Sequence, residues 1–140
     1  MEKLRFMLSF LALILTASLA SSCGASSHGQ NPLQSITLSP ATADAQDYPN
    51  GEVQFTATGH YVDPPHTVTP QSATWEACQQ NGPITTEVSL TQGGVAQCAI
   101  GAAGTYSINA WNSDKIEPCA INACGILVCA IVGTAQLTCP

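Results

Sequence analysis

Residues 36–61 read ITLSPATADAQDYPNGEVQFTATGHY and carry the clearest structural signal in this 140-residue chain. Apolar and polar residues alternate over 36–39 until Pro40 interrupts them, and they alternate again over 53–60 after the Pro49-Asn50-Gly51 turn. Alternation with a period of two, bounded by proline and glycine turns, is typical of half-buried β-strands. The stretch therefore predicts two strands joined by a turn-rich connection.

The same alternation recurs along the rest of the chain, and nothing longer than a turn shows helical periodicity. Further strands are predicted in five segments: 73–78, 88–90, 96–100, 105–111 and 134–139. Tight turns containing glycine separate several of them, as at Gly93-Gly94. Seven short strands at such intervals predict an all-β antiparallel sandwich.

Three elements of the opening stretch and its continuation also resemble the bacterial immunoglobulin-like domains of group 2. They are a "V-x-P"-type strand at Ile36–Pro40, a "G-x-x-x-Q-F-x-A-x-G-x-Y" strand at Gly51–Tyr61, and "A-T-W" at Ala73–Trp75. Residues 87–97 (EVSLTQGGVAQ) and 103–110 (AGTYSINA) resemble the family's later motifs. The resemblance covers roughly residues 34–112 and 133–139, and it implies an immunoglobulin-like antiparallel β-sandwich of about seven strands over 34–140.

The resemblance gives individual residues a place in that sandwich. Trp75 is expected at its centre, and Tyr106 is a candidate tyrosine corner. Phe55 and Ile108 occupy the positions where antibody domains carry their inter-sheet cysteines. Trp111 has the opposite parity to Ile108, so we expect it to lie further outward than Trp75.

The amino terminus predicts export. Lys3 and Arg5 precede an apolar stretch, and small residues then lead to Cys23. Ala20-Ser21-Ser22-Cys23 resembles the lipobox of bacterial lipoproteins, although Ala20 stands where leucine is usual. Residues 1–22 are thus expected to be a lipoprotein signal peptide, and 23–33 a flexible tether with a palmitate-type acyl chain on Cys23. The alternative is ordinary cleavage after Ala20. Gly24 lacks the aspartate associated with inner-membrane retention, which favours the outer membrane.

Charge limits the partners of the expected mature chain. Without residues 1–22, eight acidic residues remain against a single base, Lys115, for a net charge near −7. A nucleic acid is not expected as a partner, because phosphate binding needs clustered Lys and Arg. The membrane is expected to be reached through the lipid alone, because the chain has no polybasic patch.

Six cysteines follow Cys23, and an even number in an exported chain predicts three disulfides. They are Cys78, Cys98, Cys119, Cys124, Cys129 and Cys139. Metal binding is the alternative, but a spacing of five between the middle cysteines is too wide for a zinc knuckle. We predict a Cys78–Cys98 bond next to a short hairpin. The other four would form two bonds that tie the loop to itself and to the last strand, with their pairing open.

A cysteine-rich insertion at about 113–132 departs from the family pattern and contains many Ile, Leu and Val residues. One interpretation is an exposed apolar platform held by disulfides for a protein or glycan partner. The other, which we favour, is that these side chains fold back and cap one end of the sandwich.

Few residues suggest chemistry. His60 and His66 flank Asp63, but we expect all three to be solvated surface residues. Asp44 and Asp47 lack the dense spacing of calcium loops and are expected to be turn acids. Motifs for nucleophilic catalysis or phosphate binding are missing from the sequence, so neither an enzyme nor a cofactor site is expected.

The sequence therefore predicts a non-catalytic lipoprotein of the bacterial cell envelope that displays one immunoglobulin-like domain as a structural or binding and adhesion module. The main alternative is a small disulfide-rich secreted ligand binder or inhibitor that acts through the 113–132 loop. A third hypothesis is an accessory subunit of a larger envelope complex.

Overall fold

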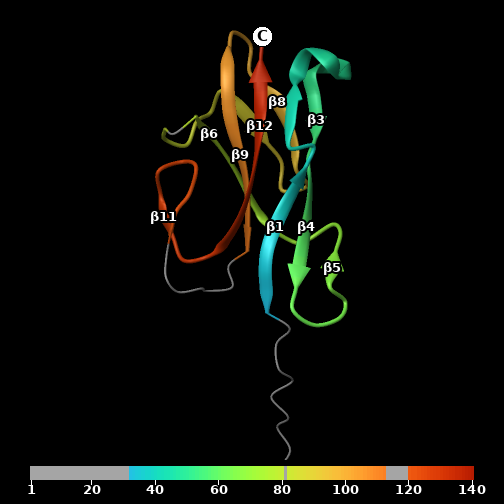
Figure 1. Ribbon diagram of the computed structural model, residues 1–140. Helices are drawn as coiled ribbons and strands as arrows, with labels where there is room; N and C mark the ends of the chain where they lie inside the picture. The colour runs from blue at the N-terminus through green and yellow to red at the C-terminus, as the bar shows by residue number, and fades with distance from the viewer. Residues whose placement is uncertain (1–31, 81, 113–119) are drawn as a thin grey trace, which may run out of the picture. The chain divides into compact units, whose positions relative to one another are not determined.

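The computed structural model describes residues 32–80, 82–112 and 120–140, which form a β-sandwich (Figure 1). The strands are β1 (Leu33–Ser39), β2 (Thr42–Asp44), β3 (Glu52–Gln54), β4 (Thr56–Tyr61), β5 (Thr67–Val68), β6 (Thr74–Gln79), β7 (Val88–Leu90), β8 (Val95–Cys98), β9 (Gly104–Asn112), β10 (Ala120–Ile121), β11 (Leu127–Val128) and β12 (Ile131–Cys139). Two short 3₁₀ turns, Ala45–Asp47 and Pro49–Gly51, lie between β2 and β3. Among the described residues there is no helix long and apolar enough to cross a membrane.

One layer of the sandwich is built around the strand pair β3 and β4, which are separated only by Phe55. β4 lies between β1 and β5, and β3 pairs with β8, which pairs with β7; all these pairings are antiparallel. The other layer has the order β2-β12-β9-β6. These strand orders match the two sheets of an immunoglobulin-like sandwich.

The amino-terminal segment of the domain, which contains β1 and β2, divides between the two layers. β1 pairs antiparallel with β4, whereas β2 pairs parallel with β12 in the opposite sheet. Pro40 lies at the crossing, where it ends β1 because proline has no backbone N–H to donate to the sheet. The sequence predicted that β1 stops at Pro40 but not that the chain continues into the second sheet.

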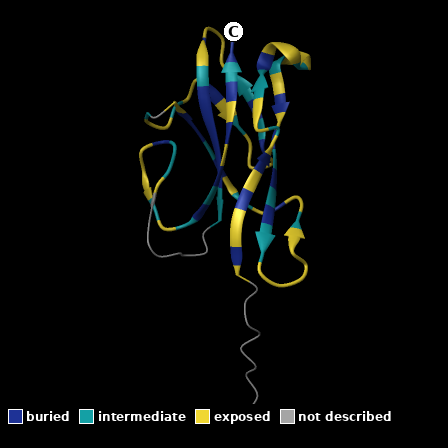
Figure 2. Cartoon of the chain, in the orientation of Figure 1, coloured by how far each residue is buried: buried dark blue, intermediate teal, exposed yellow. Residues whose placement is uncertain are grey.

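Buried and exposed residues alternate along several strands (Figure 2), and the side chains of the buried ones fill a core between the layers. Val53, Phe55, Ile108 and Leu137 are fully buried. Phe55 and Ile108 therefore provide apolar packing at the positions where antibody domains have their inter-sheet disulfide.

The two tryptophans differ as the strand parity predicted. Trp75 in β6 is only 8% exposed, whereas Trp111 near the end of β9 is half-buried. Tyr106 at the start of β9 is 3% exposed, and its hydroxyl donates to the carbonyl of Ala103, 3.3 Å away. This bond to the backbone three residues upstream is the arrangement of a tyrosine corner, which confirms that prediction.

All seven predicted strand segments are strands in the structure, with shifts of a few residues at their ends. The all-β, immunoglobulin-like class is confirmed. The main additions are the short strands β2, β5, β10 and β11, which are too short to show alternation. β12 also begins at Ile131, so the last strand takes over the end of the predicted insertion.

Candidate functional site

The disulfides connect different parts of the domain from those expected. Cys78 is bonded to Cys124 with a Cα–Cα distance of 5.5 Å, and Cys98 is bonded to Cys139 at 5.9 Å. The predicted Cys78–Cys98 bond is therefore wrong. Cys129 is also disulfide-bonded, whereas Cys119 lies outside the described residues.

Strand parity explains the actual pairing. Trp75 points into the core, so Cys78, three residues along the same strand, points to the outer surface of its sheet. Cys98 instead shares the parity of the fully buried Ala96 and belongs to the opposite sheet. The side chains of Cys78 and Cys98 therefore cannot meet, because the β2-β12-β9-β6 sheet lies between them.

Cys98 and Cys139 both face inward, one from each layer, and their bond joins β8 to β12. Cys139 has the parity of the fully buried Leu137, and it is itself 3% exposed. The bond therefore fastens the last strand, as expected for Cys139, but it fastens that strand to the opposite sheet.

The Cys78–Cys124 bond holds the β10–β11 hairpin over the outer face of β6 and β9. Asn109 of β9 is fully buried beneath it and donates through Nδ2 to Cys124 Sγ. Asn122 donates through Nδ2 to Glu76 Oε1 at 2.8 Å. The described part of the insertion thus covers a sheet face, and the prediction that it caps one end of the sandwich is wrong.

The hairpin also carries exposed apolar side chains. Ile121 and Leu127 form a cross-strand pair and are 72% and 67% exposed. Ile131, by contrast, is buried in the core as the first residue of β12. The apolar residues of the insertion are therefore divided between the core and the surface.

The histidines and turn acids lie apart, in surface positions. His60 Nε2 is 3.0 Å from Thr37 Oγ1, and both His66 and Asp63 are exposed. Asp44 Oδ1 accepts a hydrogen bond from the backbone N–H of Gln46, which caps the Ala45–Asp47 turn. In the described part of the chain, no three His, Cys, Asp or Glu side chains are grouped so that they could hold a metal ion.

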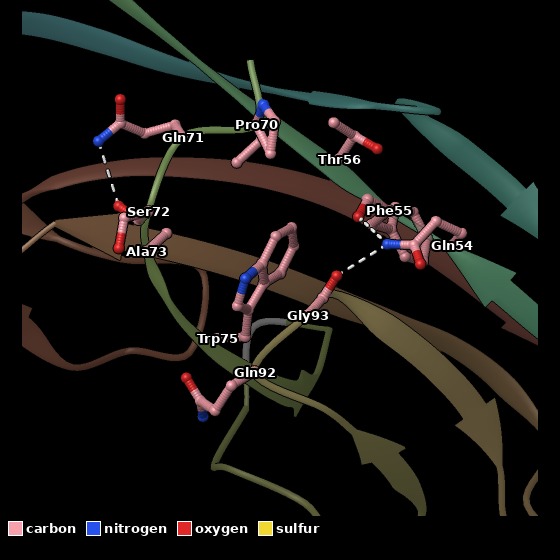
Figure 3. A pocket seen from close by; sticks show the side chains of 11 residues that line it. Gln54, Phe55, Thr56, Pro70, Gln71, Ser72, Ala73, Trp75, Gln92 and Gly93 are labelled. Atoms are coloured by element: carbon pink, nitrogen blue, oxygen red, sulfur yellow. Dashed lines mark hydrogen bonds between the residues drawn. The ribbon is translucent and has the colours of Figure 1, made fainter. Parts of the chain in front are cut away.

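A hollow of about 550 Å³ opens where the first layer forks at Phe55 (Figure 3). The backbone N–H of Phe55 donates to Gly94, whereas the carbonyl of Ala57 accepts from Gln71. Residues two apart in a strand direct their backbone groups to the same side. One continuous strand therefore has two different neighbours on that side, and the gap between them is the fork hollow.

Trp75 forms the floor of the fork hollow, and polar side chains surround it. Figure 3 shows its indole between the segment 70–73 and Gly93, with the indole nitrogen on the side of Ser72 and Ala73. The surrounding polar residues are Gln54, Thr56, Gln71, Ser72 and Gln92. None of the described lining residues is charged.

Two glutamines hold the walls of the fork hollow. Gln54 Nε2 donates to the carbonyls of Phe55 at 2.7 Å and Gly93 at 2.8 Å, which ties the β7–β8 turn to β3. The buried Gln71 accepts from the hydroxyl of Tyr61 at 2.6 Å and donates to the carbonyl of Ser72 at 3.1 Å. The walls are thus fixed by hydrogen bonds within the protein. The pattern of the sequence does not predict the hollow, because its lining comes from four separate segments.

Elsewhere in the sandwich, Tyr106 also donates to Glu87 Oε2, 2.9 Å away. Burial, reinforced by the hydrogen bond to Glu87 and by its negative charge, raises the pKa of Tyr106 above its ordinary value of 10.0. The pair is a structural contact in which the neutral phenol is the favoured form.

Comparison with known protein families found no family model that matches this chain. A search of curated proteins likewise found no relative.

Proposed function

We propose that this protein is a non-catalytic lipoprotein of the bacterial cell envelope, anchored through Cys23, that displays an immunoglobulin-like domain of the bacterial group 2 type as a binding or structural module. The observation that carries the proposal is the pair of disulfides within the sandwich. Disulfides persist in oxidising compartments, so the domain is extracytoplasmic.

Two features support the anchored form. The basic and apolar start of the sequence leads directly to Cys23, as in lipoproteins. The sandwich then begins at Leu33, so about ten residues separate its first strand from the proposed lipid. Acyl chains at that distance would keep the domain close to the membrane by burial of their methylene groups. The outer membrane is the proposed location, because Gly24 follows the cysteine.

The mature N-terminus tests this proposal directly. Mass spectrometry of the protein from membranes should find Cys23 as the first residue with a diacylglycerol-sized mass addition. Cys23→Ala should remain unprocessed or be released from the membrane fraction, whereas the tether variant Ser26→Ala should behave as wild type. A Cys23→Ala protein that is cleaved normally and stays in membranes would refute the anchor.

A secreted binder that acts through the β10–β11 hairpin is the second candidate. The exposure of Ile121 and Leu127 favours it, because a cross-strand apolar pair on a disulfide-held hairpin is a common form of contact surface. Lipidation separates the two candidates, since an inhibitor must diffuse to its target. A mature protein that starts at Ser21 and is found in the medium would favour the secreted binder.

A further inference from the structure

The indole N–H of Trp75 is a donor that solvent reaches at the floor of the fork hollow. It makes no hydrogen bond to the described residues, and it is not buried, unlike the unpaired indole N–H of Trp111. The neighbouring Gln71 differs, because both ends of its amide are paired within the protein. The unpaired donor of Trp75 lies at the floor of the fork hollow (Figure 3).

The lining determines what kind of ligand would fit. None of the described residues around the fork hollow is charged, so an ionic ligand would find no counter-charge there. Hydroxyl and amide groups of Thr56, Ser72 and Gln92 are present at its rim and make no hydrogen bond to the described residues. These groups can both donate and accept, which suits a ligand that carries several hydroxyl groups.

An extended peptide fits the fork hollow less well. Strand addition needs a row of free backbone N–H and C=O groups. At the fork, the N–H of Phe55 is paired with Gly94, its carbonyl is paired with Gln54, and the carbonyl of Ala57 is paired with Gln71. Side chains rather than backbone would therefore have to recognise the ligand.

We propose that the fork hollow binds a neutral saccharide, with the Trp75 indole N–H donating to one of its oxygens and the rim hydroxyl and amide groups contacting the others. A sugar ring is uncharged, carries many hydroxyl groups, and also has C–H faces that suit the apolar parts of the lining. The volume of about 550 Å³ is within the usual range of small-molecule sites, roughly 300–1,000 Å³. This inference rests on the proposed binding role and names its ligand class.

The site is preformed, which favours binding because its side chains and loops lose little conformational entropy when a ligand binds. Gly94, with a φ of +83°, lets the β7–β8 turn pack directly against the indole. A Cβ at Gly94 would overlap the Phe55 carbonyl oxygen and would lie 2.9 Å from Trp75 Cζ2. The Gln54 bridge to Gly93 then fixes the opposite wall.

Titration of the full mature protein, followed by its indole N–H resonances in ¹⁵N NMR spectra, tests the inference. The protein is kept in a detergent without a sugar headgroup and titrated with cellobiose, maltose or N,N′-diacetylchitobiose. At least one of these should shift the Trp75 resonance with saturation below about 50 mM, a weak affinity of a few kcal/mol. The Trp111 resonance should not move.

Two pairs of variants locate the site. Gln92→Glu places a charge at the rim and should weaken binding at least about tenfold, which corresponds to roughly 1.4 kcal/mol. Gln46→Glu makes the same change at an exposed residue outside the fork hollow and should bind as wild type. Trp75→Phe removes the donor, part of the ring and the reporter resonance, so its titration is followed by the backbone amide resonances of Gly93 and Gly94, which should no longer saturate. Trp111→Phe should leave the saturation of the Trp75 resonance unchanged.

Several outcomes would overturn the inference. They are no shift of Trp75 with any of the three saccharides, equal shifts of both indoles, equal effects of the two glutamate variants, or an equal response to glucuronate or to a blocked tri-alanine peptide. If Trp75→Phe does not fold, the comparison of Gln92→Glu with Gln46→Glu still tests the inference. A lipidated protein that binds no saccharide would refute this inference and leave the proposed anchoring intact.

Discussion

Removal of the two disulfides, one at a time, should destabilise the domain to different extents, although both close loops of similar length. The sequence separations are 46 residues for Cys78–Cys124 and 41 for Cys98–Cys139. In the chain-entropy model each loop alone contributes about 4 kcal/mol to the free energy of unfolding. The loops overlap over residues 98–124, so loss of one bond while the other remains should cost about 2–4 kcal/mol.

The difference arises from what each bond covers in the folded state. Cys78→Ala with Cys124→Ala removes the sulfur acceptor of Asn109 Nδ2, which lies in a fully buried side chain. A buried donor left without a partner costs a further 1–3 kcal/mol or so. Cys98→Ala with Cys139→Ala leaves no comparable buried polar group unpaired among the described residues. The first double variant should therefore be the less stable of the two.

Guanidinium unfolding followed by tryptophan fluorescence measures this difference. The extrapolated free energies in water should be compared rather than the midpoints, because loss of a cross-link expands the unfolded chain and raises the m-value. Peptide mapping without reduction should first confirm the two bonds in the wild type. Equal destabilisation by the two double variants, the reverse order, or a mapped Cys78–Cys98 bond would refute the reasoning.

Four further outcomes are expected from single substitutions in the sandwich, each measured by chemical or thermal unfolding. Trp75→Ala should cost about 3–5 kcal/mol through the cavity it leaves, and a loss below about 1 kcal/mol would contradict its central place. Trp111→Phe should leave the free energy of unfolding unchanged or raise it by up to about 1 kcal/mol, because the indole N–H of Trp111 is buried without a partner among the described residues. A clear loss of stability in this variant would contradict that reasoning. Gly94→Ala should cost more than about 2 kcal/mol from its positive φ and its overlap with neighbours, and Gly101→Ala, which has a similar φ but open space, is the matched control. The raised pKa of Tyr106 means that the unfolded state loses its phenol proton first, so stability should fall as the pH rises through 10 toward the folded pKa; Tyr106→Phe should show a smaller fall, and an unchanged one would exclude this linkage.

The alternation of apolar and polar residues was sufficient to predict the seven main strands, because each of them buries one face in a common core. Trp75 and Tyr106 could be placed for the same reason, since parity and position in the strand decide what they contact. Pro40 marked the end of β1, but a proline shows only where pairing stops. The parallel pairing of β2 with β12 depends on tertiary contacts that three residues do not encode.

The disulfide pairing could have been derived from the same parity. Cys98 follows Ala96 and Cys139 follows Leu137 at a spacing of two, so both cysteines face inward. Cys78 follows Trp75 at a spacing of three and faces outward. Proximity along the chain suggested a different pair, and it failed because neighbouring segments of a sandwich lie in opposite sheets.

The fork hollow and the covered face of β9 could not be predicted in this way, because the alternation rule assumes that the polar side of a strand faces water. In β9 both sides are buried: Ile108 faces the core, and Asn109 is fully buried beneath the hairpin. Asn109 is tolerated there because its amide donates to Cys124 and its carbonyl oxygen accepts from Thr134 Oγ1 at 2.9 Å. A polar residue in a strand therefore shows where hydrogen-bond partners exist, whether they come from solvent or from a segment held in place by a disulfide.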